Sequence, residues 1–365
     1  MKVINIITGR DNGGGGEYVL NICSSSCYSS DLICIGEGEL VEKARSRNIP
    51  VIIFNLIDFF NDNFLNYVNK NKIEVILWHG AKAFFLHRFM NKNIKNRSLA
   101  VVHSDFKKDF VNKRFLERNI LTTFSYIGLK SFDKFIAVSQ LIQDIIKKNF
   151  SYKELHIVRN SIDINIKHQA NGITRESIGL NDSDFVFVNI ARLHPIKNHI
   201  NLIKGFKILN LKYPFSKLVI VGDGSERKKI EEFIKNNNLN NSILLLGEKH
   251  NAYRYFKLAN ANILTSISEG GEPPIVLLEG GVFETATIFP GVGYLDKIIN
   301  EDMGYKLNPY NIEDIYLAME KCLIDDKRVQ KAEEFNKFAV ERYSISKFHK
   351  KFNEIFQGKV EEEAK

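Results

Sequence analysis

Cysteines are few in this sequence, and their spacing excludes several kinds of site. Four occur in 365 residues, at Cys23, Cys27, Cys34 and Cys322, and none forms a C-x-x-C pair. The pattern of the first segment places Cys23 and Cys27 on one face of a helix. We therefore expect no disulfide bonds and no zinc site, and a reducing cytoplasm as the compartment.

Other absences narrow the location and the chemistry. No apolar run approaches the roughly 20 residues of a membrane-spanning helix. The start M-K-V-I-N-I-I-T-G becomes polar too early for a signal peptide. There is no D-x-D pair placed for Mg²⁺, no His/Cys cluster, no Walker loop and no complete G-x-G-x-x-G. We expect a cytoplasmic protein whose chemistry needs no metal and no cofactor.

Positive charge is unevenly distributed. Between Lys82 and Lys130, eleven Lys and Arg face only three acids, so this window carries the whole net charge of +8. Phenylalanines are interleaved with these cations. The mixture fits an anionic membrane surface on the inner face of the plasma membrane, and fits nucleic acid less well. The alternative is a helix pair with buried Phe and solvated Lys.

Two successive rounds of strand and helix patterns indicate two domains. Short β-rich runs alternate with helical patterns as far as residue 158, residues 164–184 are polar, and the alternation restarts at Phe185–Ile190. This predicts two doubly wound parallel sheets, with ligands beyond the carboxyl ends of the strands and in the cleft between the domains. The predicted domains are residues 1–165 and 166–340, followed by a helix over 341–365 with a frayed end.

Glycines and cations follow predicted strands. Gly14, Gly15 and Gly16 lie between the first strand and a helix expected from Glu17 to Cys27, where backbone N–H groups can approach an anionic ligand. A flexible turn is the alternative. Arg192 and Lys197 follow the strand F-V-F-V-N-I, with Lys197 expected at the start of the next helix, and suit a diphosphate. The alternative for this pair is an exposed turn.

Three further groups end strands. Gly222 precedes a helix for which Ser225 is the expected N-cap. His79 and His103 each end a strand, where a histidine can bond a sugar hydroxyl or serve a structural role. The segment T-S-I-S-E-G-G-E-P-P-I-V-L-L-E-G-G joins a strand to a helix; its carboxylates can bond sugar or ribose hydroxyls while helix N–H groups meet a phosphate.

Seven segments together carry a family resemblance. They are G-G-G-E (14–17), V-V-H (101–103), F-D-K-F-I-A-V-S (132–139), I-V-R-N-S-I-D (157–163), A-R-L-H-P-I-K-N (191–198), V-I-V-G-D-G-S (219–225) and the acidic segment 265–281. In this order they resemble a retaining glycosyltransferase of the GT-B fold, family 4 type. The resemblance implies two Rossmann-like domains, acceptor-side first and donor-side second, with the C-terminal helix returning to the first domain.

The resemblance also implies roles for residues. Arg192 and Lys197 would bind the donor diphosphate, with Gly222, Gly270 and Gly271 beside it, and Glu279 the ribose. Glu269 or Glu272 would face the donor sugar and His103 its C6 side. Gly14–Gly16 would lie near phosphate and acceptor, and His79 and Asn160 on the acceptor side. The donor would be a nucleotide-diphosphate sugar, UDP-sugar favoured, and the acceptor a glycan or lipid-linked glycan of bacterial surface polysaccharide synthesis.

The spacing of the acidic motif departs from the family pattern. Nine residues separate Glu269 from Glu279, where the family has seven, and six separate Glu272 from Glu279. Either Glu269 or Glu272 therefore remains a candidate for the sugar contact. Two other functions stay open: a catalytically silent nucleotide-sugar-binding subunit of a glycosylation complex, and a GT-B-fold nucleotide-sugar epimerase.

Overall fold

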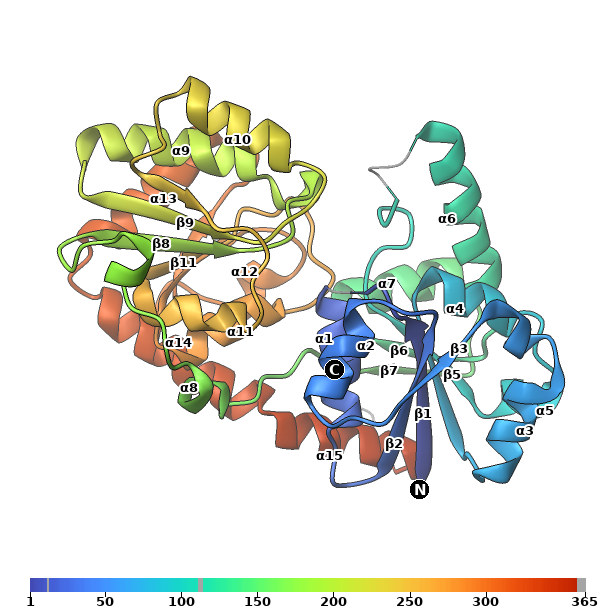
Figure 1. Cartoon of the computed structure of the whole chain (residues 1–365). Helices are drawn as coiled ribbons and strands as arrows, with labels where there is room; N and C mark the ends of the chain where they lie inside the picture. The colour runs from blue at the N-terminus through green and yellow to red at the C-terminus, as the bar shows by residue number, and fades with distance from the viewer. Residues whose placement is uncertain (12, 111–113, 360–365) are drawn as a thin grey trace. The chain divides into compact units, whose positions relative to one another are not determined.

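The chain folds into two compact units (Figure 1). The computed structural model describes residues 1–11, 13–110 and 114–359. Unit 1 is Met1–Ser161 with Ile345–Lys365, and unit 2 is Ile162–Ser344. Three parts of the sequence expectations fall outside the described residues: Asn12 of the glycine tract, residues 111–113 of the basic window, and the end predicted to fray from residue 360. The predicted boundaries at 165 and 340 stay a prediction.

Unit 1 contains a seven-stranded parallel sheet in the order β3-β2-β1-β4-β5-β6-β7. Its strands are rich in Val, Ile and Leu because both faces of a parallel sheet are buried. The strands are β1 (Lys2–Thr8), β2 (Ser29–Ile35), β3 (Val51–Phe54), β4 (Val75–His79), β5 (Ser98–Val102), β6 (Lys134–Ala137) and β7 (Glu154–Ile157).

Helices of unit 1 pack on this sheet, and the last of them comes from the end of the chain. Phe348, Phe352 and Ile355 of α15 enter the same buried cluster as Ile6 and Trp78. The expected return of the C-terminal helix to the N-terminal domain is therefore confirmed. The helices are α1 (Gly14–Cys23), α2 (Glu39–Ser46), η1 (Leu56–Phe59), α3 (Asp62–Lys70), α4 (Gly80–His87), α5 (Lys92–Asn96), α6 (Phe115–Leu129), α7 (Gln140–Asn149) and α15 (Ile345–Phe356).

Unit 2 contains a six-stranded parallel sheet in the order β10-β9-β8-β11-β12-β13. Alternate residues of β8 enter different clusters: Phe185 and Phe187 join one, Val186 and Val188 the other, so both faces are covered. The strands are β8 (Phe185–Ile190), β9 (Ser216–Val221), β10 (Ile243–Leu245), β11 (Ala261–Ile263), β12 (Ala286–Pro290) and β13 (Tyr305–Leu307).

The helices of unit 2 complete the doubly wound pattern. Along the chain of unit 2, strands and helices alternate, as the sequence analysis predicted for a Rossmann-like domain. They are α8 (Ile166–Gln169), η2 (Glu176–Ile178), η3 (Pro195–Lys197), α9 (His199–Lys212), α10 (Arg227–Asn236), η4 (Ala252–Leu258), α11 (Ile275–Val282), α12 (Leu295–Ile298), α13 (Ile312–Ile324) and α14 (Arg328–Tyr343).

Four local predictions were wrong. Helix α1 begins at Gly14 rather than Glu17 and ends at Cys23, so Cys27 lies outside it and shares no helix face with Cys23. Helix α10 has Glu226 at its N-cap, so Ser225 does not cap it. Lys197 lies in the 3₁₀ turn η3 and not in the first turn of α9, which begins at His199.

Candidate functional site

The strand order defines a switch point in each sheet. In unit 1 the chain runs outward in opposite directions from β1 and β4, and in unit 2 from β8 and β11. Loops at the carboxyl ends of such a strand pair separate, which leaves the ligand-binding crevice of a doubly wound sheet. The glycine tract follows β1 and His79 ends β4; Arg192 and Lys197 follow β8 and the acidic segment follows β11. Each unit thus has predicted site residues at its own switch point.

In unit 1 the glycines form the first turn of α1. The Asp11 carboxylate accepts hydrogen bonds from the N–H groups of Gly13 at 3.0 Å and Gly16 at 3.2 Å. A Cβ on Gly16 would lie 2.8 Å from the Asp11 carbonyl oxygen, and one on Gly15 would lie 3.7 Å from the His103 ring. A Cβ on Gly14 would meet nothing within 4 Å. The structure therefore places Gly15 against His103 and leaves the Gly14 position open.

His103 is the outermost member of a polar chain that runs into the core. Its Nε2 lies 2.9 Å from Nδ1 of His79, and Nε2 of His79 lies 3.1 Å from Oδ1 of Asn5. The Asn5 amide then donates to Ser30 Oγ at 2.8 Å. His79 and Asn5 are fully buried, while His103 is partly exposed. Both ring nitrogens of His79 have protein partners, so its predicted acceptor-side role stays a prediction.

This hydrogen-bond chain fixes the tautomers of both rings. Asn5 Oδ1 is an acceptor only, so His79 carries its proton on Nε2 and presents a bare Nδ1. His103 must then donate from Nε2, which leaves its own Nδ1 as an acceptor. Burial lowers the pKa of His79 and lowers that of His103 to about 4, against the opposing charge of Asp11. Both rings are neutral near pH 7, and His103 offers an acceptor to a hydroxyl.

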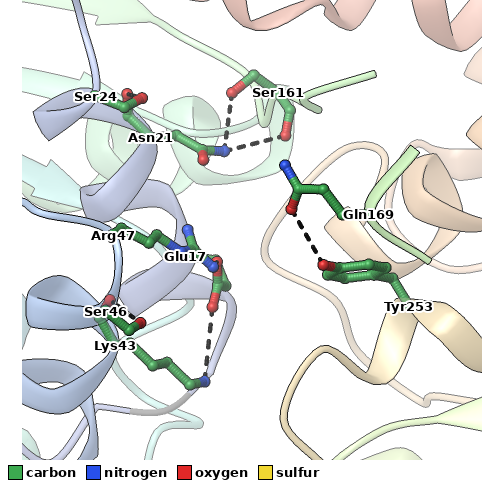
Figure 2. Close-up of polar contacts among 9 residues, drawn as sticks. All are labelled: Glu17, Asn21, Ser24, Lys43, Ser46, Arg47, Ser161, Gln169 and Tyr253. Carbon is green, nitrogen blue, oxygen red and sulfur yellow. Dashed lines mark hydrogen bonds and ion pairs between the residues drawn. The ribbon is translucent and has the colours of Figure 1, made fainter. Parts of the chain in front are cut away.

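Glu17, the last residue of the G-G-G-E motif, forms ion pairs with Lys43 of α2 and with Arg47, which follows α2. Its carboxylate receives Nη2 of Arg47 at 2.7 Å and lies 3.6 Å from Nζ of Lys43 (Figure 2). Glu17 therefore links α1 to α2 and to Arg47, the residue that follows α2. No local sequence pattern indicated this pairing, because thirty positions separate Glu17 from Arg47.

Ser161 stands where the resembled motif has glycine, and its hydroxyl has a partner. The Asn21 side chain of α1 donates to Ser161 Oγ at 3.2 Å and to its carbonyl oxygen at 3.3 Å (Figure 2). Asn160, predicted on the acceptor side, is buried beside it, and its role stays a prediction. In unit 2, also drawn in Figure 2, the Tyr253 hydroxyl donates to Gln169 at 3.3 Å and links η4 to α8.

In unit 2 the basic and acidic loops are in contact. Nζ of Lys197 lies 2.5 Å from Oε1 of Glu269, and both side chains are largely buried, at 20% and 10% exposure. Backbone bonds hold the loops together: the Ile267 N–H donates to the Ile196 carbonyl at 2.9 Å, and the Thr265 hydroxyl donates to the Lys197 carbonyl at 3.1 Å. The structure thus joins two segments that lie 72 positions apart.

Arg192 is exposed on the same loop as Lys197. Its guanidinium makes no hydrogen bond or ion pair with any residue that the structure describes. The loop is held by the strand-end glycines: a Cβ on Gly222, whose φ is +144°, would lie 2.0 Å from the Ala191 carbonyl oxygen. Gly222 thus has a packing reason that is independent of any ligand, and its predicted donor contact stays a prediction.

The remaining acidic-segment residues differ in exposure. Glu272 is buried at 2% exposure and is joined to Pro273 by a cis peptide bond. Glu279 lies on α11 and is partly exposed. Gly270 and Gly271 lie in the non-helical stretch between β11 and α11. The donor roles predicted for these residues remain predictions.

His199 was not predicted, although it adjoins Lys197. It is buried at the start of α9, neither ring nitrogen has a hydrogen-bond partner among the described residues, and burial lowers its pKa to about 4. Asp11 and Asn5 were also missed. The tract R-D-N-G-G-G-G could have indicated Asp11, since a carboxylate before a helix is a common cap; no signal in the sequence indicated Asn5.

Other potential sites in the described residues are few. No three His, Cys, Asp or Glu side chains there are grouped as metal ligands. A shallow hollow lined by Phe54, Asp58, Asn63 and Tyr67, among others, lies at the edge strand β3 and contains none of the predicted residues. Among the helices that are described, none is both long and apolar enough to cross a membrane.

One protein-family model matches the segment that holds Lys197 and Glu269. Residues 171–342 match the family Glycosyl transferases group 1. The matched segment lies inside unit 2 and contains its whole switch point. The matched residues include Arg192, Lys197, Glu269, Glu272 and Glu279.

Two relatives show how far the similarity extends. The chain is 32% identical over 155 residues to an uncharacterized glycosyltransferase, MJ1059, of Methanocaldococcus jannaschii, covering 41% of this chain and 38% of that protein. It is 24% identical over 333 residues to the UDP-Gal:alpha-D-GlcNAc-diphosphoundecaprenol alpha-1,3-galactosyltransferase of Escherichia coli, covering 82% and 81%. The first alignment thus spans well under half of its relative.

A solved structure matches the whole fold. HepE from Anabaena, in complex with UDP and glucose, superposes with a TM-score of 0.83 and 18% identity over 98% of this chain and 100% of that chain. At this identity the match speaks for the fold alone. The GT-B fold predicted from the sequence, with two Rossmann-like α/β domains, is confirmed.

Proposed function

We propose that the protein is a glycosyltransferase of the EC 2.4 class that transfers a sugar from a UDP-sugar to a lipid-linked glycan in bacterial surface polysaccharide synthesis. The observation that carries the proposal is the arrangement after β8 and β11. There an exposed, unpaired Arg192 lies on the loop of Lys197, which contacts Glu269, at the switch point of a glycosyl transferases group 1 segment.

The two cations suit a diphosphate leaving group. When the bond to the sugar breaks, the departing diphosphate gains negative charge, and cations already fixed in place stabilise that gain. The Arg192 guanidinium presents a planar fork for phosphate oxygens, and Lys197 is a compact charge held by the loop contacts of Ile196. No metal ion is needed in this scheme.

Glu269 is our candidate for the sugar contact, rather than Glu272. Its carboxylate lies against Lys197, so it is next to the place where the diphosphate would bind and can accept bonds from sugar hydroxyls there. Glu272 is almost fully buried, which leaves it little access to a ligand. Glu279, partly exposed on α11, is assigned to the ribose hydroxyls, with Gly270 and Gly271 beside the sugar.

In unit 1 we assign His103 to a sugar hydroxyl. Its Nδ1 is the acceptor that the chain through His79 and Asn5 leaves free, and Gly14 and Gly15 let a ligand approach the ring and the first turn of α1. A neutral ring is poor at stabilising an anion, so we assign His103 to a hydroxyl and not to a phosphate.

Donor, acceptor and stereochemistry follow from the relatives by analogy. HepE was solved with UDP and glucose, and the Escherichia coli relative is named for UDP-Gal and a diphosphoundecaprenol acceptor. We propose transfer with retention, in which the departing phosphate takes the proton of the attacking hydroxyl.

A donor panel tests the proposal. Purified full-length protein is incubated with UDP-, GDP- and ADP-sugars in EDTA, and thermal stabilisation, hydrolysis and transfer to a short-chain diphospholipid-linked sugar are measured. We expect a UDP-sugar to raise the melting temperature and to be consumed. Arg192→Ala should lose both effects, and Lys212→Ala should keep them, since Lys212 pairs with Glu320 at the far end of α9.

The same panel separates the two other functions. A silent binding subunit predicts stabilisation by UDP with no turnover on any acceptor. An epimerase predicts isomerisation of the donor sugar without an acceptor. Either result, or the lack of any response to every donor, contradicts the proposed transferase.

A further inference from the structure

Helix α6 has an apolar face that unit 1 does not use. Ser125, Gly128 and Leu129 form its buried side, and a Cβ on Gly128 would lie 2.5 Å from the backbone of Phe84, so this end packs tightly on α4. On a different side, Leu116 and Ile120 are 71% and 45% exposed. A helix with a packed side and a second, exposed apolar side has a surface that the fold itself does not explain.

The exposed side has helical spacing. Leu116, Ile120 and Phe124 recur at every fourth position, so they form one stripe along α6, and Phe124 is 43% exposed. Figure 1 shows the N-terminal half of α6, drawn in teal, extending beyond α4 within unit 1. The stripe therefore stands on a projecting part of the unit.

The stripe continues as a row of phenylalanine rings on neighbouring elements. Phe124 stacks on Phe85 of α4 with ring centroids 4.8 Å apart, Phe85 meets Phe89 at 5.3 Å, and Phe89 meets Phe60 at 5.6 Å. Phe89 and Phe60 are 55% and 61% exposed. We call the six residues the apolar strip: Phe60, Phe85, Phe89, Leu116, Ile120 and Phe124.

Exposed and partly exposed cations lie on or next to the helices that carry the apolar strip. Lys82 lies three positions before Phe85 on α4 and so shares its face, and Arg114 precedes α6. Arg118 lies over the Phe115 ring at 5.4 Å, and Lys130 over the Tyr126 ring at 4.6 Å. The surface thus offers both an apolar stripe and a positive charge, which an anionic bilayer complements.

The composition of the strip selects lipid over nucleic acid. The phenylalanines of the strip have planar rings that could stack on bases, but the part of the strip at Leu116 and Ile120 of α6 is aliphatic and offers no such ring. Aliphatic and aromatic groups on a projecting helix suit the acyl boundary of a bilayer, while each nearby Lys or Arg adds about 1 kcal/mol of attraction to anionic headgroups. We propose that the apolar strip and its cations dock unit 1 on the surface of an anionic phospholipid bilayer.

This inference goes beyond the proposed function and does not depend on it, because vesicle binding is measured without donor or acceptor. Full-length protein is floated with vesicles of phosphatidylcholine alone or with 30% phosphatidylglycerol, a composition chosen for the assay. We expect binding to the anionic vesicles, weakened at high salt because screening shortens electrostatic attraction. Lys82→Glu with Arg114→Glu should weaken it in the same way.

The apolar stripe is tested separately. Leu116→Ser with Ile120→Ser should lower vesicle affinity about tenfold or more, since each side chain loses its transfer from water. Both residues are exposed, so the melting temperature should not change. Leu211→Ser with Val329→Ser is the matched control, because these residues are 77% and 61% exposed on helices of unit 2. The control should bind like the wild type.

Several outcomes overturn the docking proposal. The wild type could fail to bind anionic vesicles, or bind anionic and neutral vesicles equally well. Vesicle affinity could also fall equally in Leu116→Ser with Ile120→Ser and in the control, Leu211→Ser with Val329→Ser. A wild-type dimer that Leu116→Ser with Ile120→Ser makes monomeric, without vesicle binding, would assign the strip to a second copy. A wild-type protein that binds anionic vesicles but transfers no sugar would contradict the proposed function and leave the docking proposal in place.

Discussion

At the scale of single residues, the predicted site residues differ in their exposure and in their partners. Lys197 and Glu269 form a close pair, Arg192 is exposed without a partner among the described residues, and Glu272 is buried. Because Glu269 and Glu272 differ in this way, substitutions of the two acids should have measurably different effects. The hydrogen-bond chain of His79 and His103 makes a second testable prediction, because it assigns each ring proton to one nitrogen.

Glu269→Gln and Glu272→Gln should change different properties of the protein. Removing the charge of Glu269 takes an anion away from the diphosphate position and releases Lys197, so UDP should bind about threefold to tenfold more tightly. Sugar transfer should slow, because a neutral amide is a weaker acceptor for a sugar hydroxyl. Glu272→Gln should lower the melting temperature and leave UDP affinity unchanged. Calorimetric titration with UDP and a transfer assay distinguish them; tighter UDP binding by Glu272→Gln alone would reverse our assignment.

The tautomers of His79 and His103 can be observed directly. We expect both rings at pH 7 to be neutral and protonated on Nε2, because Asn5 Oδ1 accepts from His79 and His79 accepts from His103. Long-range ¹H–¹⁵N spectra of labelled protein report the proton position, with His79→Gln and His103→Gln spectra as assignments. A proton on Nδ1 of His103, or a cationic ring, is inconsistent with the chain.

At the scale of elements, apolar runs were predicted well and glycine-rich boundaries poorly. F-V-F-V-N-I was predicted as residues 185–190, where β8 lies, because the run is apolar and bounded by polar residues. The start of α1 was placed at Glu17 because glycine disfavours helix, yet Asp11 holds the first turn over Gly14–Gly16. Local pattern cannot report such a contact.

The order of the strands in each sheet could not be predicted from the sequence either. His79 and His103 were each placed at a strand end, but their contact depends on β4 and β5 being neighbours with His79 opposite Val101. The same holds for Lys197 and Glu269, which meet because β8 pairs with β11. The residue types at strand ends could be identified from the sequence, but the strand pairing that brings them together could not.

Gly14→Ala is a clean probe of ligand approach to α1. The added Cβ meets nothing within 4 Å, so stability should change by less than about 1 kcal/mol. If a ligand uses this turn, transfer should fall while the melting temperature holds. Gly16→Ala is the contrast, since its Cβ would lie 2.8 Å from the Asp11 carbonyl oxygen and should lower stability. Full activity in Gly14→Ala would remove the first turn of α1 from the site.

At the scale of the whole molecule, buried histidines couple stability to pH. Burial lowers the pKa of His87 to about 3 and those of His103 and His199 to about 4. Unfolding restores values near 6.5, so the unfolded chain takes up protons between pH 6.5 and 4 that the folded chain does not. Stability should therefore be full above about pH 6.5 and fall below it.

Between pH 7.5 and 5.5 we expect the free energy of unfolding to decrease, by up to about 1.4 kcal/mol per pH unit for each buried histidine below pH 6.5. Urea titrations at several pH values measure this slope. His199→Phe should make the slope shallower, and His168→Gln, at an exposed position, should not. A stability that is flat or rises toward pH 5.5 would contradict the assignment of neutral buried rings.

The central claim is that Arg192 and Lys197 form the diphosphate site of unit 2. The most direct measurement is calorimetric titration of UDP into wild type, Arg192→Ala, Lys197→Ala and Lys212→Ala, all in EDTA. We predict that UDP binds to the wild type and to Lys212→Ala alike, and about tenfold or more weakly to each of the other two. UDP binding that is absent from the wild type, or unchanged in both Arg192→Ala and Lys197→Ala, would contradict it.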